Sequence, residues 1–335
     1  MKKTLLSLAA SLALSSLISP SAQAGGVIGV SWRHFQEERW RIDEAGIKDE
    51  LAKLGADWKY VSADAQSDPQ KQLGDVEGLL AQGAKALILL AQDANTIGPA
   101  IARAKADGVP VVAYDAPIDS ADVFFVSFDN VAVGRLMAKA MVAAQPKGNW
   151  ALIKGDAVHS IVNVFEAGQM EVLKPLIDKG DIKIAAAQNV ENWKPDVAQS
   201  TMEQILTANN NKIDAVLAMN DGMAGGVVAA LAAQGLAGIP VSGQDGDKAA
   251  LNRIARASKP YRFGRIPTNS GAPRRVAVAL ASGKEPKAVE GAVDYAPPAA
   301  STSPRSCSSP RRSPATLSIW CSTPSGSTRP RCARA

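Results

Sequence analysis

Short apolar runs alternate with amphipathic stretches from residue 27 to residue 247 of this 335-residue chain. In the first amphipathic stretch, Trp40, Ile47, Leu51 and Leu54 are spaced to fall on one face of a helix. Alternation of this kind predicts βαβ units, in which helices connect parallel strands, and therefore an α/β fold. The predicted strands are 27–32, 58–62, 86–91, 111–115, 124–128, 150–154, 183–187, 215–219 and 241–244.

Polar residues follow several of the predicted strands. The carboxyl ends of parallel strands face the ligand crevice of an open sheet, so recurring polar residues there indicate a polar ligand. Asp and Asn also cap helices, and each residue taken alone fits that alternative. The recurrence at five strand ends favours a ligand site. The residues are Asp93, Asp115, Asp156, the Asn220–Asp221 pair and Asp245.

The first 24 residues have the parts of a secretory signal peptide. Lys2 and Lys3 precede a short apolar stretch that contains serine, and the segment ends in Ala22-Gln23-Ala24. A membrane anchor would need about 20 strongly apolar residues, more than this stretch provides. We therefore predict cleavage after Ala24 and a location in a bacterial periplasm.

The net charge of +5 comes from the end of the chain. Residues 297–335 contain six arginines, no acidic residue and all three cysteines, Cys307, Cys321 and Cys332. Without those arginines the chain has 31 basic and 32 acidic side chains, a net charge of −1. A body so close to neutral does not favour a nucleic-acid partner.

Motifs of catalytic, metal-binding and nucleotide-binding sites are missing from the sequence. The chain has two histidines, His34 and His159, and lacks HExxH, CxxC and GxSxG spacings. Neither GxGxxG nor GxxxxGK[ST] follows a predicted strand. We therefore expect a binding protein without enzyme activity, metal or cofactor.

Four segments have specific sequences: ERW at 38–40, LTANNNKIDAV at 206–216, NDGMAGG at 220–226 and SGQD at 242–245. With their surroundings, over residues 26–256, they resemble the periplasmic D-xylose-binding proteins of ABC sugar importers. The resemblance extends to the wider group of ribose-, galactose- and xylose-type binding proteins. It implies a type I periplasmic binding protein, with two lobes, each a parallel sheet flanked by helices, and a three-crossing hinge.

On this basis the chain divides into four parts. They are a signal peptide at 1–24, a first lobe at 25–128 completed by about 258–290, a second lobe at 129–257 with 291–298 as its candidate completion, and an out-of-frame or disordered tail at 299–335.

The resemblance also implies which side chains bind a sugar. Arg39 matches the arginine of the ERW motif, and Asp115, Asn220 and Asp245 match residues that bind hydroxyl groups. Charged partners make stronger hydrogen bonds to hydroxyls than neutral ones. Trp193 matches a tryptophan that stacks on the sugar ring.

Two further residues complete the predicted site. We predict Trp32 as a second aromatic wall and His159 as a ligand residue. Alternatives stay open without the resemblance: Arg39 as a solvated helix charge, the tryptophans as packing residues and His159 as a surface residue.

Two departures from the family pattern bear on the choice of sugar. Asp115 is followed by Ala116, where the family has arginine. In GDAVHSIVNVF, His159 and Asn163 lie near positions that usually present a carboxylate and an amide. A buried polar group without its partner costs about 1–3 kcal/mol, so we expect D-xylose or a related aldose that differs at one hydroxyl.

The strand and helix pattern breaks after residue 256. Residues 257–275 and 299–335 are rich in Pro, Arg and Ser, while 276–286 is again similar to the family. Codons permitted for both segments, read one nucleotide back, can encode strand-like peptides such as TVSVWKD. We hypothesise two frame slips, with a genuine disordered Ser/Pro/Arg tail as the alternative. Slips would expose the edge of the first sheet and weaken binding; an uninterrupted frame on resequencing would contradict them.

We therefore predict a periplasmic solute-binding protein that closes two lobes around a monosaccharide, with a free energy of binding of about −8 kcal/mol. The expected partners are the permease of an ABC importer and a chemoreceptor, and the expected state is a monomer. A LacI-type sugar-responsive regulator would instead begin with a helix-turn-helix. A sugar-modifying enzyme would need an arranged acid–base pair.

Overall fold

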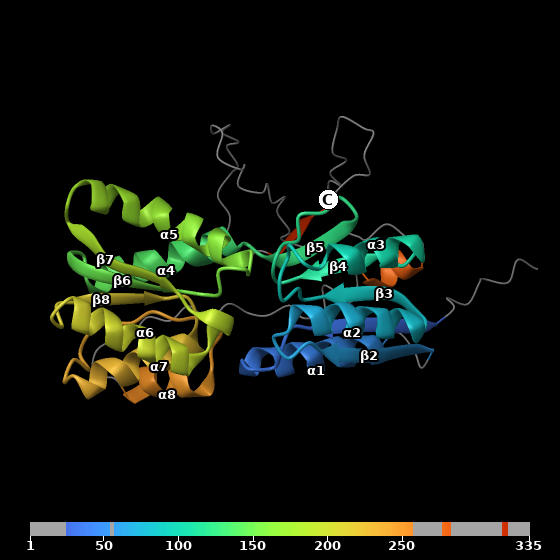
Figure 1. Cartoon of the computed structure of the whole chain (residues 1–335), viewed down its shortest axis with the longest axis horizontal. Helices are drawn as coiled ribbons and strands as arrows, with labels where there is room; N and C mark the ends of the chain where they lie inside the picture. The colour runs from blue at the N-terminus through green and yellow to red at the C-terminus, as the bar shows by residue number, and fades with distance from the viewer. Residues whose placement is uncertain (1–24, 54–56, 257–276, 283–316, 321–335) are drawn as a thin grey trace, which may run out of the picture.

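Two lobes lie side by side in the computed structural model, which describes residues 25–53, 57–256, 277–282 and 317–320 (Figure 1). The first lobe contains β1 (Gly26–Trp32), α1 (Glu38–Ala52), β2 (Trp58–Asp64), α2 (Pro69–Ala81), β3 (Ala84–Leu89), α3 (Gly98–Ala106), β4 (Val111–Tyr114), β5 (Val123–Phe128) and β9 (Leu317–Trp320). The second contains α4 (Asn130–Ala144), β6 (Gly148–Lys154), α5 (Ile161–Asp178), β7 (Ile182–Asn189), a 3-10 turn (Glu191–Trp193), α6 (Pro195–Ala208), β8 (Ala215–Ala218), α7 (Asp221–Ala233) and α8 (Lys248–Arg256).

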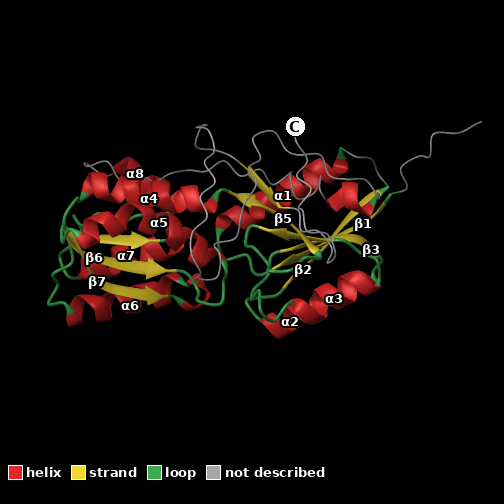
Figure 2. Ribbon diagram, turned by 90° about the horizontal axis from the view of Figure 1, so that it is seen from above, coloured by secondary structure: helices red, strands yellow, loops and turns green. Residues whose placement is uncertain are grey.

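Each lobe is built on its own sheet, with helices on both faces (Figure 2). The strand order is β2-β1-β3-β4-β5-β9 in the first lobe and β7-β6-β8 in the second. Neighbouring strands from β1 to β8 pair in parallel, as predicted. Because both faces are covered, the strands read as nearly continuous apolar runs. Since the strands are parallel, their carboxyl ends lie at the same edge of each sheet.

The helices follow from apolar spacing and local capping. Trp40, Ile47 and Leu51 are buried on α1 at the predicted spacing. The Asp68 carboxylate accepts hydrogen bonds from the backbone N–H groups of the first turn of α2, which also has Pro69 at its start. The predicted helix residue Leu54 lies outside the described residues.

Strand β9 differs from two predictions. It pairs antiparallel with β5, so the first sheet is not purely parallel. It also lies in the range 299–335 predicted as a tail, whose other residues lie outside the described part of the chain. An exposed edge of this sheet was expected if the frame slips are real; the N–H and C=O groups at the outer edge of β5 instead pair with β9.

The strand predicted at 241–244 is wrong. Val241 forms a single bridge to Val216 of β8. Its two hydrogen bonds run from Val216 N–H to the Pro240 oxygen and from Ser242 N–H to the Val216 oxygen, both at 3.0 Å. The backbone then turns toward α7, where the Gln244 oxygen accepts a hydrogen bond from Asp221 N–H at 2.9 Å. The segment therefore leads out of the sheet after one pair.

The chain passes from the first lobe to the second between β5 and α4. It returns after α8, since Ala277 and Val278 are buried in the core of the first lobe with Trp40 and Ile47. The connecting residues 257–276 lie outside the described part, so the three-crossing hinge and the segment boundaries stay predictions.

Helices α4 and α5 cross at two glycines. A Cβ atom added to Gly134 would lie 2.1 Å from the Phe165 carbonyl oxygen, and one added to Gly168 would lie 1.9 Å from the Val131 oxygen. Both obstacles are backbone atoms, which cannot rotate away. The close contact of these helices therefore requires glycine at both positions.

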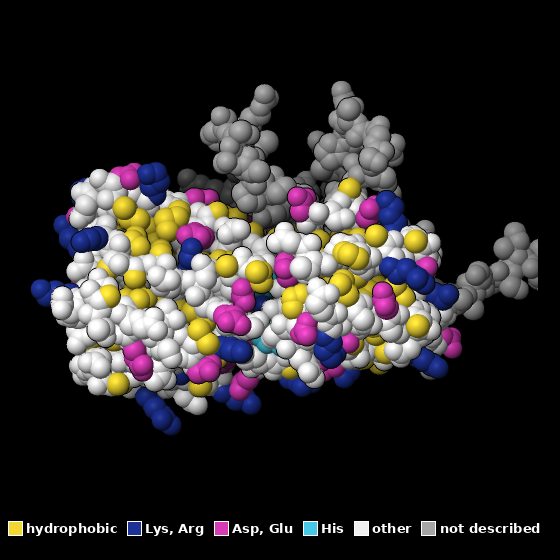
Figure 3. All heavy atoms as spheres, in the orientation of Figure 1, with side chains coloured by type: hydrophobic (Ala, Val, Ile, Leu, Met, Phe, Trp, Pro, Cys, Tyr) yellow, Lys and Arg dark blue, Asp and Glu magenta, His cyan; other side chains and the backbone are white. Residues whose placement is uncertain are grey.

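Charged side chains of both signs lie on the surface of the described residues. On the face shown in Figure 3, basic and acidic side chains are interspersed over both lobes. Among the residues that the structure describes, no helix is both long and apolar enough to cross a bilayer.

Candidate functional site

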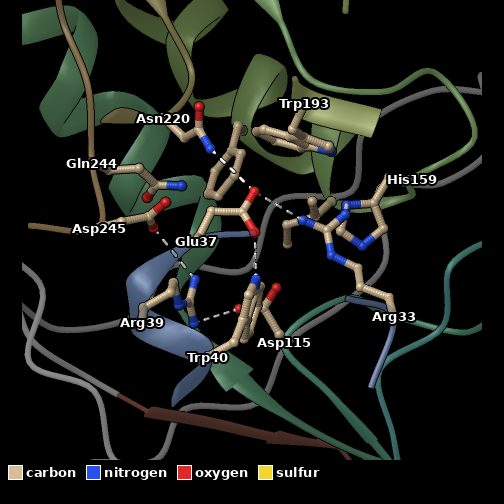
Figure 4. A pocket seen from close by; sticks show the side chains of 12 residues that line it. Arg33, Glu37, Arg39, Trp40, Asp115, His159, Trp193, Asn220, Gln244 and Asp245 are labelled. Carbon is tan, nitrogen blue, oxygen red and sulfur yellow. Dashed lines mark hydrogen bonds and ion pairs between the residues drawn. The ribbon is translucent and has the colours of Figure 1, made fainter. Parts of the chain in front are cut away.

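A cavity lies between the lobes, lined by residues of both. Five strands lead to it: Arg33 follows β1, Asp115 follows β4, His159 follows β6, Trp193 follows β7 and Asn220 follows β8. The strand ends of both sheets therefore meet here, as predicted. The lining residues are Arg33, Glu37, Arg39, Trp40 and Asp115 from the first lobe, and His159, Ile161, Phe165, Trp193, Asn220, Gln244 and Asp245 from the second (Figure 4).

Arg39 lies at the centre of a cluster of carboxylates. Its Nη2 atom donates to Asp115 Oδ1 at 2.8 Å and lies 3.6 Å from Asp43 Oδ2, while Nη1 lies 3.5 Å from Asp245 Oδ1 in the other lobe. Burial opposes its charge, but Asp115 and the other carboxylates raise the pKa of the guanidinium well above its usual value. Its side chain is only 11% exposed, which rules out the solvated-charge alternative.

The two aspartates that face Arg39 have unusual backbone conformations. Asp115 has φ 69° and Asp245 has φ 99°, in a region that non-glycine residues rarely adopt. Hydrogen bonds of its backbone hold Asp115 in place. Its N–H donates to the Val126 carbonyl oxygen at 3.1 Å, and its carbonyl oxygen accepts from Ser127 Oγ at 2.6 Å. Strained residues concentrate at functional sites, where the surrounding structure fixes them.

Asn220 serves both of the roles considered for it. Its Oδ1 accepts a hydrogen bond from Met223 N–H at 2.9 Å and so caps α7. Its Nδ2 faces the other lobe, 3.5 Å from Glu37 Oε1. Capping fixes the side chain so that its amide nitrogen points into the cavity (Figure 4).

Trp193 and His159 form the opposite wall with Arg33. The Trp193 and His159 rings meet edge to face, with centroids 5.9 Å apart. Arg33 Nη1 lies 3.2 Å from His159 Nδ1. Burial and then the nearby Arg33 charge lower the pKa of His159 well below its usual value, so the imidazole is neutral and Nδ1 accepts from the guanidinium.

Direct hydrogen bonds join the lobes around the cavity. Gln36 Nε2 donates to the Trp193 oxygen at 3.1 Å, and Gln92 Nε2 donates to Asn192 Oδ1 at 2.8 Å. Elsewhere on the rim, Ser160 Oγ donates to the Pro117 oxygen at 2.6 Å. Two polar side chains of the first lobe thus hold the turn that positions the Trp193 ring.

The model of the periplasmic binding protein domain matches residues 28–284. The chain belongs to this family. A D-xylose-binding periplasmic protein of Escherichia coli K12 is 39% identical over 292 residues, which are 86% of this chain and 87% of the relative. One of Haemophilus influenzae Rd is 39% identical over 261 residues, 77% of each chain. The solved Caulobacter myo-inositol binding protein, bound to myo-inositol, has a TM-score of 0.70 at 28% identity, over 82% of this chain and 93% of its own.

This periplasmic binding protein has the type I fold of its family, with helices flanking two sheets. The first two relatives are named D-xylose-binding periplasmic proteins, and the resemblance stated from the sequence is confirmed. Among the described residues, no group of three or more His, Cys, Asp or Glu side chains could hold a metal ion.

The structure brings six of the seven predicted site residues of the periplasmic binding protein to one cavity: Arg39, Asp115, His159, Trp193, Asn220 and Asp245.

Trp32 is the exception, and its predicted role as an aromatic wall is wrong. It is fully buried beneath the site, where Nε1 donates to the Tyr60 hydroxyl at 2.9 Å and the ring packs on Trp40. As the last residue of β1 it points into the core, because alternate strand residues face opposite ways. Trp40, on α1, provides the ring that lines the cavity instead.

Four other polar residues singled out from the sequence do not line the cavity. Asp221 Oδ2 accepts from Gly246 N–H at 2.8 Å and from Asp247 N–H at 3.0 Å, next to Asp245. Asp93 accepts from Asn95 N–H at 2.8 Å, a local turn. Asp156 accepts from Asn192 N–H at 2.6 Å and so supports the turn that carries Trp193. Asn163, expected near the ligand, is exposed on α5.

Sequence reasoning missed several lining residues of the periplasmic binding protein. Glu37 is only 4% exposed, accepts from Trp40 Nε1 at 2.6 Å and lies 3.6 Å from Arg33 Nη2. The four-residue spacing of Arg33 and Glu37 could have indicated the pair. Charges that flank a helix start usually face water, whereas here Trp40 of the first lobe and His159 and Asn220 of the second lobe contact them. The other missed residues are Ile161, Phe165 and Gln244.

The buried carboxyl of Asp245 predicts how stability changes with pH. Burial raises its pKa to about 8, against the opposing charge of Arg39, from 3.8 in an unperturbed chain. Between these values the folded protein holds a proton that the unfolded chain has released, so the contribution of this carboxyl to the free energy of unfolding falls as pH rises. The buried histidines His34 and His159, whose pKa values burial lowers, contribute with the opposite sign below about pH 6.5. Asp221, whose pKa burial raises to about 6, adds to the slope at the acidic end.

We expect Asp245→Asn to remove this negative contribution, so that the slope of the free energy of unfolding against pH becomes more positive between pH 5 and pH 8, measured by urea unfolding at several pH values. The exposed Asp178→Asn serves as the matched control and should leave the slope unchanged. A wild-type slope retained in the Asp245 variant would contradict the assignment of the proton to this carboxyl.

Proposed function

We propose that this periplasmic binding protein captures a monosaccharide, D-xylose or a related aldose, and delivers it unaltered to the permease of an ABC importer. One observation above all supports this: charged, amide and aromatic side chains from strand ends of both lobes converge on a single small cavity. The curated relatives named as D-xylose-binding proteins support the choice of an aldose.

The cavity offers the two kinds of surface that a pyranose needs. Its hydroxyl rim is bound by Asp115 and Asp245 as acceptors and by Arg39 and Asn220 as donors. Its C–H faces pack against aromatic rings, of which Trp40 and Trp193 line the cavity. The ion pairs of Arg39 keep these groups in place, so the binding geometry is fixed in advance.

Capture proceeds by closure of the lobes. The hydrogen bonds of Gln36 and Gln92 to the Asn192–Trp193 turn form only when the lobes meet, and a sugar that bonds to both lobes favours that state. Free energies of binding near −8 kcal/mol, in the micromolar range, allow both capture and release.

The remaining parts of the proposal follow from the family and the sequence. Residues 1–24 are cleaved on export to the periplasm, where the protein works as a monomer. The closed form docks on the permease and also presents itself to a chemoreceptor. The relatives are periplasmic sugar-binding proteins of transport systems, which agrees with this placement.

The test is tryptophan fluorescence during titration with a panel of pentoses, hexoses and polyols. Because Trp40 and Trp193 line the cavity, a bound aldose should change the emission and saturate it at micromolar to submillimolar concentrations. An amino acid panel serves as the negative control. A folded protein whose fluorescence responds to none of the sugars would contradict the proposed function.

A further inference from the structure

Arg33 is a buried guanidinium at the cavity with few hydrogen-bond acceptors near its donors. Arg33 is 4% exposed, and within the described residues its Nε atom has no hydrogen-bond partner. Its nearest carboxylate oxygen, Glu37 Oε1, lies 3.6 Å from Nη2, beyond hydrogen-bond distance. Arg39, by contrast, has three carboxylates within 3.6 Å.

The position of Arg33 is fixed without saturating its donors. The guanidinium carbon lies 5.6 Å from the centre of the Trp40 ring and 5.7 Å from that of Trp193. The only short polar contact that the structure gives it is to the neutral Nδ1 of His159, at 3.2 Å. Since Arg33 can only donate, His159 accepts at Nδ1 and carries its proton on Nε2. Two donors with few acceptors therefore lie side by side at this wall (Figure 4).

We propose that Arg33, supported by His159, is a specificity-determining residue that donates to one hydroxyl oxygen of the bound sugar. This inference rests on the proposed function and adds a residue to it that faces a different part of the ring from Arg39. The chemistry of the wall selects an acceptor, because neither Arg33 nor His159 Nε2–H can bond to a donor.

Such a contact affects the difference in affinity between two sugars more than it affects the affinity for either one. An aldose with its hydroxyl at this position gives the buried guanidinium an acceptor. An epimer or deoxy sugar without it leaves the donor unpaired, and sites built to bond a hydroxyl reject analogues that lack it. The neighbouring Ile161 and Phe165 are apolar and cannot substitute for the missing acceptor.

The test combines R33M with the monodeoxy derivatives of the sugar that the wild type binds best. Dissociation constants are measured by calorimetry for the wild type, R33M and R41M, a matched control on the exposed side of α1, where the Arg41 side chain is 64% exposed. We expect R33M to weaken binding of the parent sugar by about 10- to 100-fold. For one monodeoxy derivative, the wild type and R33M should bind within about 3-fold of each other. That derivative identifies the hydroxyl that Arg33 contacts.

A purely structural role of Arg33 gives a different pattern. Loss of lobe closure would weaken the parent sugar and every derivative by the same factor, and that outcome overturns the proposal, as does an unchanged affinity for the parent. Thermal unfolding checks that R33M is folded, and R33L, which also lacks any donor, carries the same test should R33M unfold. A wild type that binds no sugar at all overturns the proposed function itself, and this inference with it.

Discussion

Replacing Arg39 with methionine is expected to abolish sugar binding and to destabilise the protein. The substitution removes the cation from three carboxylates, Asp43, Asp115 and Asp245, that all lie within 3.6 Å of it. Breaking a buried ion pair by removing one partner costs about 3–5 kcal/mol. The sugar loses a donor as well, so the affinity should fall by at least about 100-fold.

Calorimetric titration and urea unfolding measure the two effects. Without Arg39, the pKa values of Asp43 and Asp245 should rise further, because Arg39 is what opposes their burial. The loss of stability should therefore be smaller at pH 5, where the buried carboxyls are protonated and neutral, than at pH 8, where they carry charges. Arg41→Met, on the same helix with a 64% exposed side chain, should change neither quantity. Affinity within tenfold of the wild type in the Arg39 variant would show that the cluster is not part of the site.

The second large effect is expected from Gly168→Val in α5. Its new Cβ would lie 1.9 Å from the Val131 oxygen and 2.9 Å from the Arg135 nitrogen, both backbone atoms of α4. Relief requires the two helices to separate, which exposes the core of the second lobe. We expect the free energy of unfolding to fall by about 3 kcal/mol or more, with loss of sugar binding because α5 begins beside His159.

Urea unfolding followed by circular dichroism tests this prediction. The matched control is Gly78→Ala in α2, where an added Cβ meets nothing within 4 Å. That change should stabilise the protein by about 0.4–1 kcal/mol, since alanine loses less backbone freedom on folding. If the free energy of unfolding of Gly168→Val falls by less than about 1 kcal/mol, the two helices can separate at little cost, and the predicted overpacking is contradicted.

The local pattern of the sequence was sufficient for most of the framework. Apolar runs such as 150–154 gave strands that begin or end within two residues of those observed, because both faces of the sheets are covered. The segment 241–244 was wrongly predicted as a strand because an apolar–polar alternation does not reveal where a backbone leaves its sheet. Pairing with β8 ends after one bridge, and where it ends depends on the packing of the whole lobe, not on the sequence of residues 241–244.

The site was predictable where position along a strand determines it. Asp115 and Asn220 were found because strand ends of a parallel sheet gather at one edge. Arg33 and Glu37 were missed because their surroundings include His159 and Asn220 of the other lobe, which approach them only in the folded chain. The prediction for Trp32 failed because its side chain points into the core and not toward the cavity. Side chains of successive strand residues point to opposite faces, so a shift of one residue changes which side chain faces the site.

The central claim is that polar side chains at the strand ends of two lobes hold a sugar between them. A crystal structure of the protein with the aldose selected by the fluorescence panel tests it most directly. The account predicts the ring between Trp40 and Trp193, with hydroxyls about 2.7–3.2 Å from oxygen or nitrogen atoms of Asp115, Asn220 and Arg39. A sugar bound elsewhere on the surface, with Asp115 and Asp245 still paired only to Arg39, would contradict it.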